Sequence, residues 1–306
     1  MSTITSRIDT STNRDLMKAG ALRKIFDDTD TSPAIFYKPL VNEITTNEEI
    51  KKDQEIAGFT AFTALVEGQN IPLQLPVVGN QKTYTLARYG TGFRITAWME
   101  KYNKYDLIKR LTRSLKKVMA ESKDIEIHKM FNNPTTTITG FDTTHLAEDA
   151  HTGLLGGSTA DNYDNLLNVA PSYTALASAK YYFDTLVNNV GMYMGMTPDL
   201  LVYNPTLWPT IREILSSDLV PHEFSNTKSA FKGWIKDYMD PRVTSTTGWF
   251  ILAKKDDNFD LNVFTGMEAN FLMKDAPDNT MDKVALSECH FTYGFGNPKA
   301  YLLGQA

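Results

Sequence analysis

The sequence predicts an α+β fold, in which one long helix lies beside separate stretches of strand. Residues 103–132 form the longest uninterrupted helical pattern of the chain, with apolar side chains three and four residues apart. Residues 58–100 and 261–306 instead alternate apolar and polar side chains between turn residues, as strands do. A smaller mixed α/β unit is expected between residues 172 and 260.

The composition of the chain limits the classes of protein to which it can belong. The chain has 306 residues, of which 42% are hydrophobic and 22% charged, as is ordinary for a globular protein with room for two domains. A net charge of −5 argues against a broadly basic surface that grips nucleic acid. The single cysteine, Cys289, excludes an intrachain disulfide. The N-terminus lacks the apolar core of a signal peptide, and no run is long enough to span a membrane, so a cytosolic setting is expected.

Residues 1–57 are predicted to form an N-terminal arm. Residues 1–13 are rich in Ser, Thr and charge and have too little apolar content to pack. Asn13 is placed to cap a short helix. Pro33 and Pro39 then bracket an extended segment, because the residue before a proline is pushed out of the helical region.

Residues 58–100 are predicted to form a projecting hairpin. Apolar side chains alternate over residues 71–77, Gly79-Asn80 provides a turn, and short strands are expected within residues 83–98. Two prolines in the first arm each remove a ladder donor, which places that arm at an edge. A two-stranded hairpin is marginal alone in water, so a neighbouring copy of the chain is expected to support it.

The helix predicted for residues 103–132 begins at Asn103 as N-cap and ends before Pro134. At about 1.5 Å per residue it spans roughly 45 Å. It has a single apolar stripe, which predicts a helix lying along the outside of a domain. The stripe consists of Ile108, Leu111, Leu115, Val118 and Ile125.

The polar face of this helix is basic in its first half and acidic in its second. The basic residues are Lys104, Lys109, Arg110, Arg113, Lys116 and Lys117. One interpretation is a solvated face. The other is a surface that meets an acidic neighbouring chain or nucleic acid, and the sequence leaves both open.

Residues 101–171 are expected to complete the domain of the long helix, with a loop-rich tract at 134–168. The next domain, 172–260, begins with a helix predicted at 173–190 and a strand at 200–203. Asn204 or Thr206 then caps a further helix whose first turn holds Pro209. Further strands are expected at 248–253, 261–264, 268–273, 284–293 and 300–303. The last four belong to a final segment, residues 261–306, whose strands are expected to join the edge of the 172–260 domain and the domain of the long helix.

Catalytic patterns are not recognisable. His145 and His151 lie near Asp142, Glu148 and Asp149, but this spacing matches no familiar zinc pattern. The glycines of GLLGGST lack the Gly-Lys-Ser/Thr ending of a phosphate loop, and Cys289 is predicted within a strand. No enzymatic activity, metal or cofactor is therefore expected. A hydrolase or a metal-dependent enzyme that uses the tract from His145 to His151 is the remaining alternative.

The order of these parts resembles the major capsid proteins of tailed bacteriophages, the Hong Kong 97 fold, whose parts are the N-arm, E-loop, spine helix, P-domain and A-domain. Over residues 132–304 the chain is most similar to Mu-type head subunits. The motifs are FNNPTT and EDAHTGLLGG after the helix, Asn165-Leu166-Leu167, PDLLVYNPTLWPTIREIL, and the closing FTYG and NPKAY. The first fifty residues carry no such motif.

The resemblance implies a major capsid protein that assembles through pentamers and hexamers into an icosahedral shell around double-stranded DNA. It further implies a separate scaffolding protein, a portal, decoration proteins, DNA held without sequence-specific contact, no membrane, and assembly in the host cytoplasm. An encapsulin-like nanocompartment and another phage structural protein are the alternatives. Residues expected at contacts between subunits are Leu73, Leu75, Val77, Lys82, Tyr84, Leu86, Phe93, Lys109 and Arg113.

Overall fold

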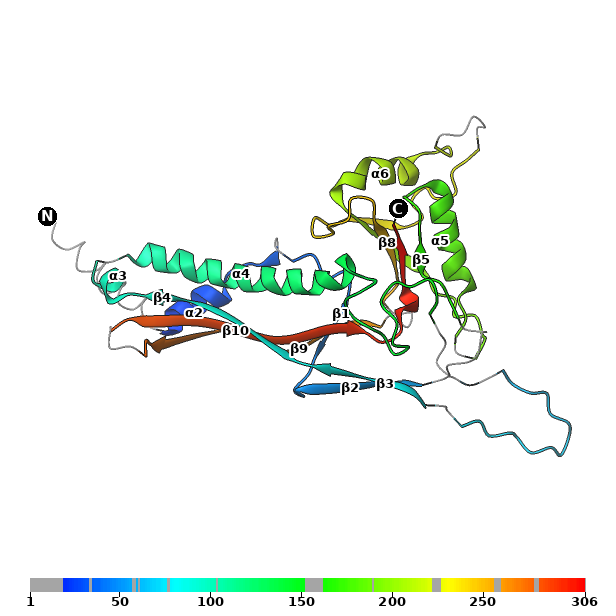
Figure 1. Cartoon of the computed structure of the whole chain (residues 1–306), viewed down its shortest axis with the longest axis horizontal. Coiled ribbons are helices and arrows are strands. Elements are labelled where there is room, and N and C mark those ends of the chain that lie inside the picture. The colour runs from blue at the N-terminus through cyan, green and yellow to red at the C-terminus, as the bar shows by residue number, and fades with distance from the viewer. Residues whose placement is uncertain are drawn as a thin grey trace.

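The computed structural model describes residues 19–32, 35–56, 59, 61–75, 78–102, 104–151, 162–188, 190–221, 227–255, 260–277 and 281–305. These residues form an elongated lobe, a compact lobe at one end of it, and a ribbon that projects past the compact lobe (Figure 1). Helices and strands are mixed within both lobes.

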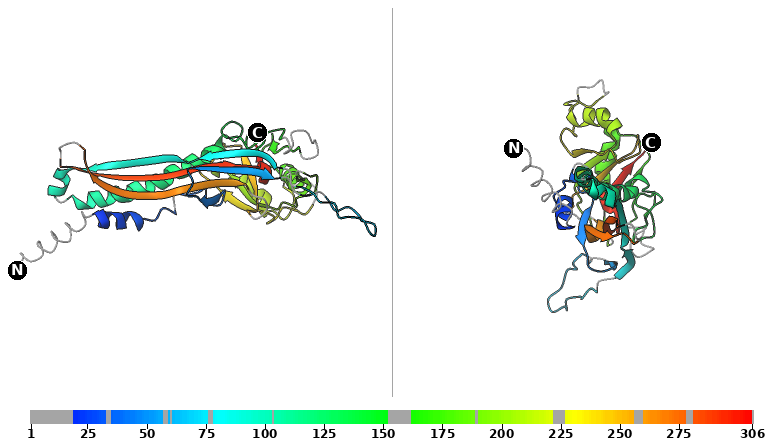
Figure 2. Two further views of the ribbon diagram at one scale, coloured as in Figure 1. Left: turned by 90° about the horizontal axis from the view of Figure 1, so that it is seen from below. Right: turned by 90° about the vertical axis from the view of Figure 1, so that its left-hand side faces the viewer.

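The elongated lobe is a four-stranded sheet covered on one face by helices. Its order is β1-β9-β10-β4, antiparallel except that β1 joins β9 in parallel. The strands are β1 (Asn42–Thr45), β9 (Leu261–Asp275), β10 (Lys283–Phe295) and β4 (Ala87–Ile95). The covering helices are α2 (Ala19–Asp27) and α4 (Tyr105–Asn132). The short helix α3 (Ala97–Lys101), which has no buried residue, follows β4. Seen from below, the long strands run side by side along α4 (Figure 2).

Helix α4 confirms the predicted long helix but not its predicted buried face. It begins at Tyr105, with Lys104 at the N-cap position and no side-chain cap, and Asn103 lies outside the described residues. Ile108 and Leu115 are buried, whereas Val118 and Ile125 are 45% and 43% exposed. The buried face instead continues through Met119, Lys123, Asp124, Ile127, His128, Met130 and Phe131. The reason is that the second half of α4 also contacts the compact lobe, which buries polar positions that the apolar pattern could not reveal.

The compact lobe is a five-stranded sheet of order β5-β11-β8-β6-β7. Its strands are β5 (Leu166–Leu167), β6 (Pro198–Tyr203), β7 (Lys236–Met239), β8 (Trp249–Ala253) and β11 (Tyr301–Gly304). The central strand β8 is buried throughout, which fits its uninterrupted apolar sequence WFILA. The polar edge strand β7 (KDYM) was not expected, because it has no alternating pattern.

Helices α5 (Tyr173–Thr185) and α6 (Trp208–Ser216) lie in the compact lobe (Figure 1). Ser172 caps α5 by accepting from the Ala175 amide at 3.1 Å. Asn204 caps a 3-10 turn, η3 (Pro205–Leu207), directly before α6, whose first turn holds a proline as predicted. Helix α5 ends earlier than predicted, because the backbone at Leu186 turns extended and its carbonyl accepts from the Met194 amide at 2.9 Å.

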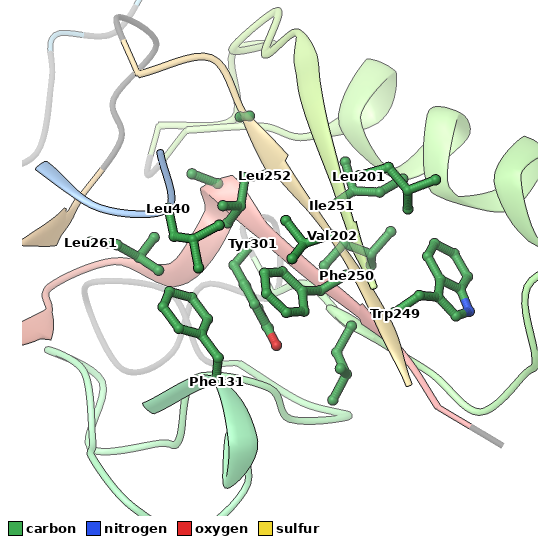
Figure 3. Packing of buried hydrophobic residues seen from close by; sticks show 14 of the residues in the cluster. Leu40, Phe131, Leu201, Val202, Trp249, Phe250, Ile251, Leu252, Leu261 and Tyr301 are labelled. Carbon is green, nitrogen blue, oxygen red and sulfur yellow. The ribbon is translucent and has the colours of Figure 1, made fainter. Parts of the chain in front are cut away.

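One apolar core joins the two lobes. Phe131, at the end of α4, stacks on Phe250 of β8 with ring centroids 5.2 Å apart, and Tyr301 of β11 packs beside both (Figure 3). Aromatic pairs of this kind contribute about 0.5–1.5 kcal/mol beyond the area they bury. Leu40 of the N-terminal segment and Leu261 of β9 belong to the same core. The lobes are therefore held in a fixed relation by packing.

Gly304 is predicted to be intolerant of a side chain. A Cβ at this position would lie 2.1 Å from Cε2 of Trp249, whose indole N–H donates to the Val169 carbonyl at 3.2 Å. Trp249 is fully buried and has no space to move aside. We expect Gly304→Ala to lower the free energy of unfolding by about 1–3 kcal/mol in urea titrations.

Gly20 in α2 provides the control for this substitution, since a Cβ there meets no atom within 4 Å. Gly20→Ala is expected to leave stability unchanged or to raise it by up to about 1 kcal/mol through helix propensity. Equal stability of Gly304→Ala and wild type would show that the packing around Trp249 is not as tight as described.

The projecting ribbon corrects the predicted hairpin. It pairs β2 (Ile50–Ile56) with β3 (Val78–Thr85) in antiparallel register, with Ile56 opposite Val78. Gly79-Asn80 lies inside β3 and forms no turn, and residues 71–75 are coil outside any ladder. Residues 50–56, predicted as arm, belong to the ribbon, whereas the later part of the predicted hairpin, β4 and α3, belongs to the elongated lobe.

The N-terminal arm is in part an integral piece of the subunit. Residues 1–18, including the predicted cap Asn13, lie outside the described residues. Tyr37, Leu40 and Val41 are buried, and β1 pairs with β9. Residues 35–45 are therefore fixed in their own subunit and do not reach toward another.

Candidate assembly surfaces

The loop between the ribbon strands exposes a series of apolar side chains. Residues 61–75 project beyond both lobes (Figures 1 and 2). Phe62, Leu73 and Leu75 are 103%, 92% and 86% exposed, and Val66 and Ile71 are about as accessible. Exposed apolar side chains gathered in one segment mark an interaction site. Two predicted contact residues, Leu73 and Leu75, lie in this loop, while Val77 lies outside the described residues.

The base of the ribbon is anchored to the subunit itself. Lys82 Nζ donates to the carbonyls of Thr139 and Phe295, the latter at 3.1 Å, and lies over the Phe295 ring. Burial lowers the pKa of Lys82 to about 8, although the charges of Asp260 and Asp142 partly offset this. Lys82 is thus an internal anchor and not the exposed hairpin tip that the sequence suggested.

Three other predicted contact residues are buried or partly buried within the subunit. Tyr84 is 3% exposed and packs on Phe264 at 4.8 Å between ring centroids, so it is not accessible to another copy. Leu86 and Phe93 are half-buried, and Phe93 packs against the core beneath α2 and α4. The alternation of apolar and polar residues around Tyr84, Leu86 and Phe93 therefore results from packing within the subunit.

The basic residues of α4 divide into two groups. Lys109 pairs with Asp106 at 3.8 Å, and Lys116 donates to the Asp27 carbonyl at 2.7 Å on α2. Arg110 and Arg113 are exposed, and within the described residues no hydrogen bond or ion pair engages them. Lys104 and Lys117 are exposed as well.

A buried polar cluster, missed by the sequence analysis, ties α4 to the compact lobe. The Asp124 carboxylate accepts from the amides of Phe36 and Tyr37 at 2.8 and 2.9 Å and from Arg242 Nε at 3.1 Å. Arg242 also pairs with Glu121 at 2.7 Å. The sequence held no local signal for this burial, because Glu121 and His128, one turn away from Asp124 on the helix, are polar as well.

His128 completes this cluster, one helical turn after Asp124. Its Nδ1–H donates to the Asp124 carbonyl at 2.6 Å, and its Nε2 lies 2.9 Å from the carboxylate of Asp240. Burial lowers the pKa of His128, but the hydrogen bond and charge of Asp240 and the contacts with Asp124 outweigh it, so the pKa is raised. Both ring nitrogens face acceptors, which favours the imidazolium.

Lys123, the residue before Asp124 on α4, binds the N-terminal segment. Its Nζ lies 3.0 Å from the Glu43 carboxylate of β1, 3.2 Å from the Thr265 hydroxyl and 3.4 Å from Glu268 of β9. Only 9% of its side chain is exposed. A buried lysine with fewer partners would be costly, so these contacts fix where residues 35–45 cross α4.

The histidine tract at 142–151 is a loop-holding network. His151 is fully buried, with Nδ1 2.8 Å from Asp142 Oδ2 and Nε2 donating to Asn165 Oδ1 at 3.0 Å. His145 instead faces Glu148 at 3.3 Å. Among the described residues no group of three His, Cys, Asp or Glu side chains is placed to hold a metal ion. The two histidines do not converge on a common point.

Cys289 is predicted to be chemically inert in the folded protein. It lies in β10, is 5% exposed, and burial raises the pKa of its thiol to about 11. Because the thiolate is the nucleophile, a disulfide reagent at pH 8 is expected to label native protein at least tenfold more slowly than urea-unfolded protein. Equal rates would show that β10 opens readily.

The subunit combines a sheet lined by a long helix, a compact lobe at its end and an apolar loop that no other described residue covers. These features suit a protein that assembles from many copies. The chain belongs to the phage capsid protein family, whose model matches residues 79–303. It is a major capsid protein. No curated protein is similar enough to be matched.

Solved structures share the fold. The capsid of the cyanophage P-SCSP1u is similar with a TM-score of 0.59 and 11% identity, covering 89% of this chain and 88% of that one. The mature capsid of bacteriophage PhiM1 has a TM-score of 0.55 and 10% identity, covering 89% and 86%. The SrpI encapsulin of Synechococcus elongatus has a TM-score of 0.51 and 11% identity, covering 87% and 85%. Identities this low establish the fold alone.

Proposed function

We propose that this protein forms pentamers and hexamers that close into an icosahedral shell around the double-stranded DNA of a tailed phage. The observation that carries the proposal is the exposed apolar loop at residues 61–75. Phe62, Leu73 and Leu75 would be buried only against another copy. Repeated around a closed shell, such modest contacts add up to a stable assembly.

The parts of the subunit correspond to those of the Hong Kong 97 fold as follows. The ribbon at 50–85 would be the E-loop, α4 the spine helix, the elongated lobe the P-domain and the compact lobe the A-domain. Residues before β2 would be the N-arm, with only the part before α2 left to reach other copies. The similarity to Mu-type head subunits, carried by the motifs between residues 132 and 304, belongs to this proposal.

The proposed partners are a separate scaffolding protein, a portal, decoration proteins and the packaged DNA. A net charge of −5 suits a shell that encloses DNA without gripping it. The proposed place of assembly is the host cytoplasm. Among the residues that the structure describes, every helix is too short or too polar to cross a bilayer.

An encapsulin-like compartment is the second candidate, since the SrpI encapsulin shares the fold. The phage capsid family match over well over half of the chain favours the phage function. The two differ in content, because a phage shell holds DNA and an encapsulin holds protein cargo.

Electron microscopy and light scattering of the purified protein, alone and with its scaffolding protein, test the proposal. We expect closed shells or uniform pentamers and hexamers. A stable monomer or dimer under every condition would contradict the shell function. Shells from infected cells that contain protein cargo and no DNA would favour the encapsulin alternative.

A further inference from the structure

One flank of α4 carries an apolar stripe that nothing in the described structure covers. Leu107, Val118 and Ile125 are 42%, 45% and 43% exposed. They lie at positions i, i+11 and i+18, which return to the same side of a helix with 3.6 residues per turn. The buried face of the helix begins next to this stripe, about 80–100° around the helix, at Ile108 and Leu115.

The basic stripe lies beside the apolar one. Arg110, Arg113 and Lys117 are spaced i, i+3 and i+7, about 90° around the helix from the apolar stripe. Arg110 and Arg113 have no hydrogen bond or ion pair within the described residues. Between the stripes lie the exposed side chains of Ser114 and Glu121, and the charge of Glu121 is paired with Arg242 at 2.7 Å. We call this surface, made of the two stripes and Ser114, the α4 seam.

We propose that the α4 seam binds an acidic amphipathic helix of a different protein. An apolar stripe with cations along one side complements a helix that has apolar side chains on one face and carboxylates beside them. Small side chains at the centre allow two helices to approach closely. The inference goes beyond the shell function, because it concerns a partner distinct from the shell's own copies.

The charges of residues 1–18 and of α2 argue against either segment as the partner that binds the α4 seam. Residues 1–18 carry Arg7, Arg14 and Lys18 against two aspartates, so they do not supply the required negative charge. The surface of α2 presents Arg23 and Lys24 against Asp27, which is already paired with Arg23 at 3.8 Å, so it supplies no excess negative charge either. Nucleic acid would satisfy the arginines but not the three exposed apolar side chains, which have no use for a phosphate backbone.

The test uses the full-length protein and a designed 21-residue helical peptide with leucine on one face and glutamate beside it. Binding is followed by fluorescence anisotropy. We expect saturable binding that weakens at least tenfold in Arg110→Glu/Arg113→Glu and in Val118→Ser/Ile125→Ser. These positions are exposed, so the variants are expected to fold, as checked by circular dichroism.

Lys52→Glu/Lys228→Glu is the matched control, because it changes the net charge equally at exposed sites away from α4. It is expected to bind the peptide as wild type does. No binding, or equal loss in the control, would overturn the proposal. Binding of a DNA duplex that depends on the arginines but not on Val118 and Ile125, without peptide binding, would assign the seam to nucleic acid.

A second copy of the chain is the remaining occupant, and shell formation by the same variants tests it. If the serine variant fails to form shells in the absence of any partner, while wild type forms them and does not bind the peptide, the seam is a contact between copies and the proposal is wrong. Wild-type-like shells from variants that no longer bind the peptide would support it and leave the shell function intact.

Discussion

Replacing residues 57–77 by an Asn-Gly turn is expected to give a folded subunit that no longer closes into shells. Ile56 and Val78 are directly opposite each other in the ribbon, so a two-residue turn joins β2 to β3 without disturbing the ladder. The described part of the removed loop packs against no core residue, and stability should change by less than about 1 kcal/mol. Thermal unfolding and electron microscopy measure the two effects.

Substitutions within the loop separate apolar contact from loop length. Leu73→Ser/Leu75→Ser keeps the length and removes two side chains that are almost fully exposed in the subunit. Burying each in an assembly contributes about 1.5–3 kcal/mol, so their loss is expected to reduce shell yield at least tenfold. Thr63→Ser/Asn70→Ser, in the same loop, should assemble normally. Normal shells from the turn variant would remove the loop from the assembly mechanism.

The sequence predicted the elements whose pattern is local. The 28-residue helix α4 and the strands β8, β10 and β11 all follow from periodicity rules that involve neighbouring residues only. The order of these elements also supported the capsid resemblance, which the family match confirmed.

Pairing between distant segments was not predictable in the same way. The sequence analysis joined residues 71–77 to 83–87, because a Gly-Asn turn lay between them. The structure instead pairs β3 with β2 across a loop of about twenty residues. This pairing depends on the contacts that hold the base of the ribbon against the rest of the subunit. Lys82 and Tyr84 fix that base on the subunit, and neither residue carries a local signal for burial.

Buried charge was the other feature that periodicity concealed. Lys123, Asp124 and His128 lie in the polar second half of α4, where the apolar periodicity gives no sign that they are buried. Each is buried, and together they hold the N-terminal segment and the compact lobe against α4. A buried charge is recognised from sequence only through its partners, and those lie far away at Glu43 and Asp240.

His128→Leu is expected to destabilise the subunit by about 3–5 kcal/mol at pH 6, because it leaves the buried carboxylate of Asp240 without its charged partner. The matched control is Lys180→Met on α5, which breaks an ion pair with Asp184 whose side chains are 46% and 53% exposed. Exposed pairs of this kind contribute about 0–1 kcal/mol. Urea unfolding of both variants measures the difference.

The pH dependence of this loss identifies the charge on His128. The groups that face the imidazole are Asp124 on α4 and Asp240 after β7, with Arg242 bound to Asp124. The pKa of His128 is raised in the folded state, so its contribution is fully present below the unfolded value of about 6.5 and is lost as the pH rises through the folded value.

The stability gap between wild type and His128→Leu should therefore be widest near pH 6 and should narrow toward pH 9. A gap that widens with pH would mean that the neutral imidazole is the native form. Because the cluster joins α4 to the compact lobe, the same titration carried out on assembled shells shows whether subunit contacts reinforce this junction or leave it to the subunit alone.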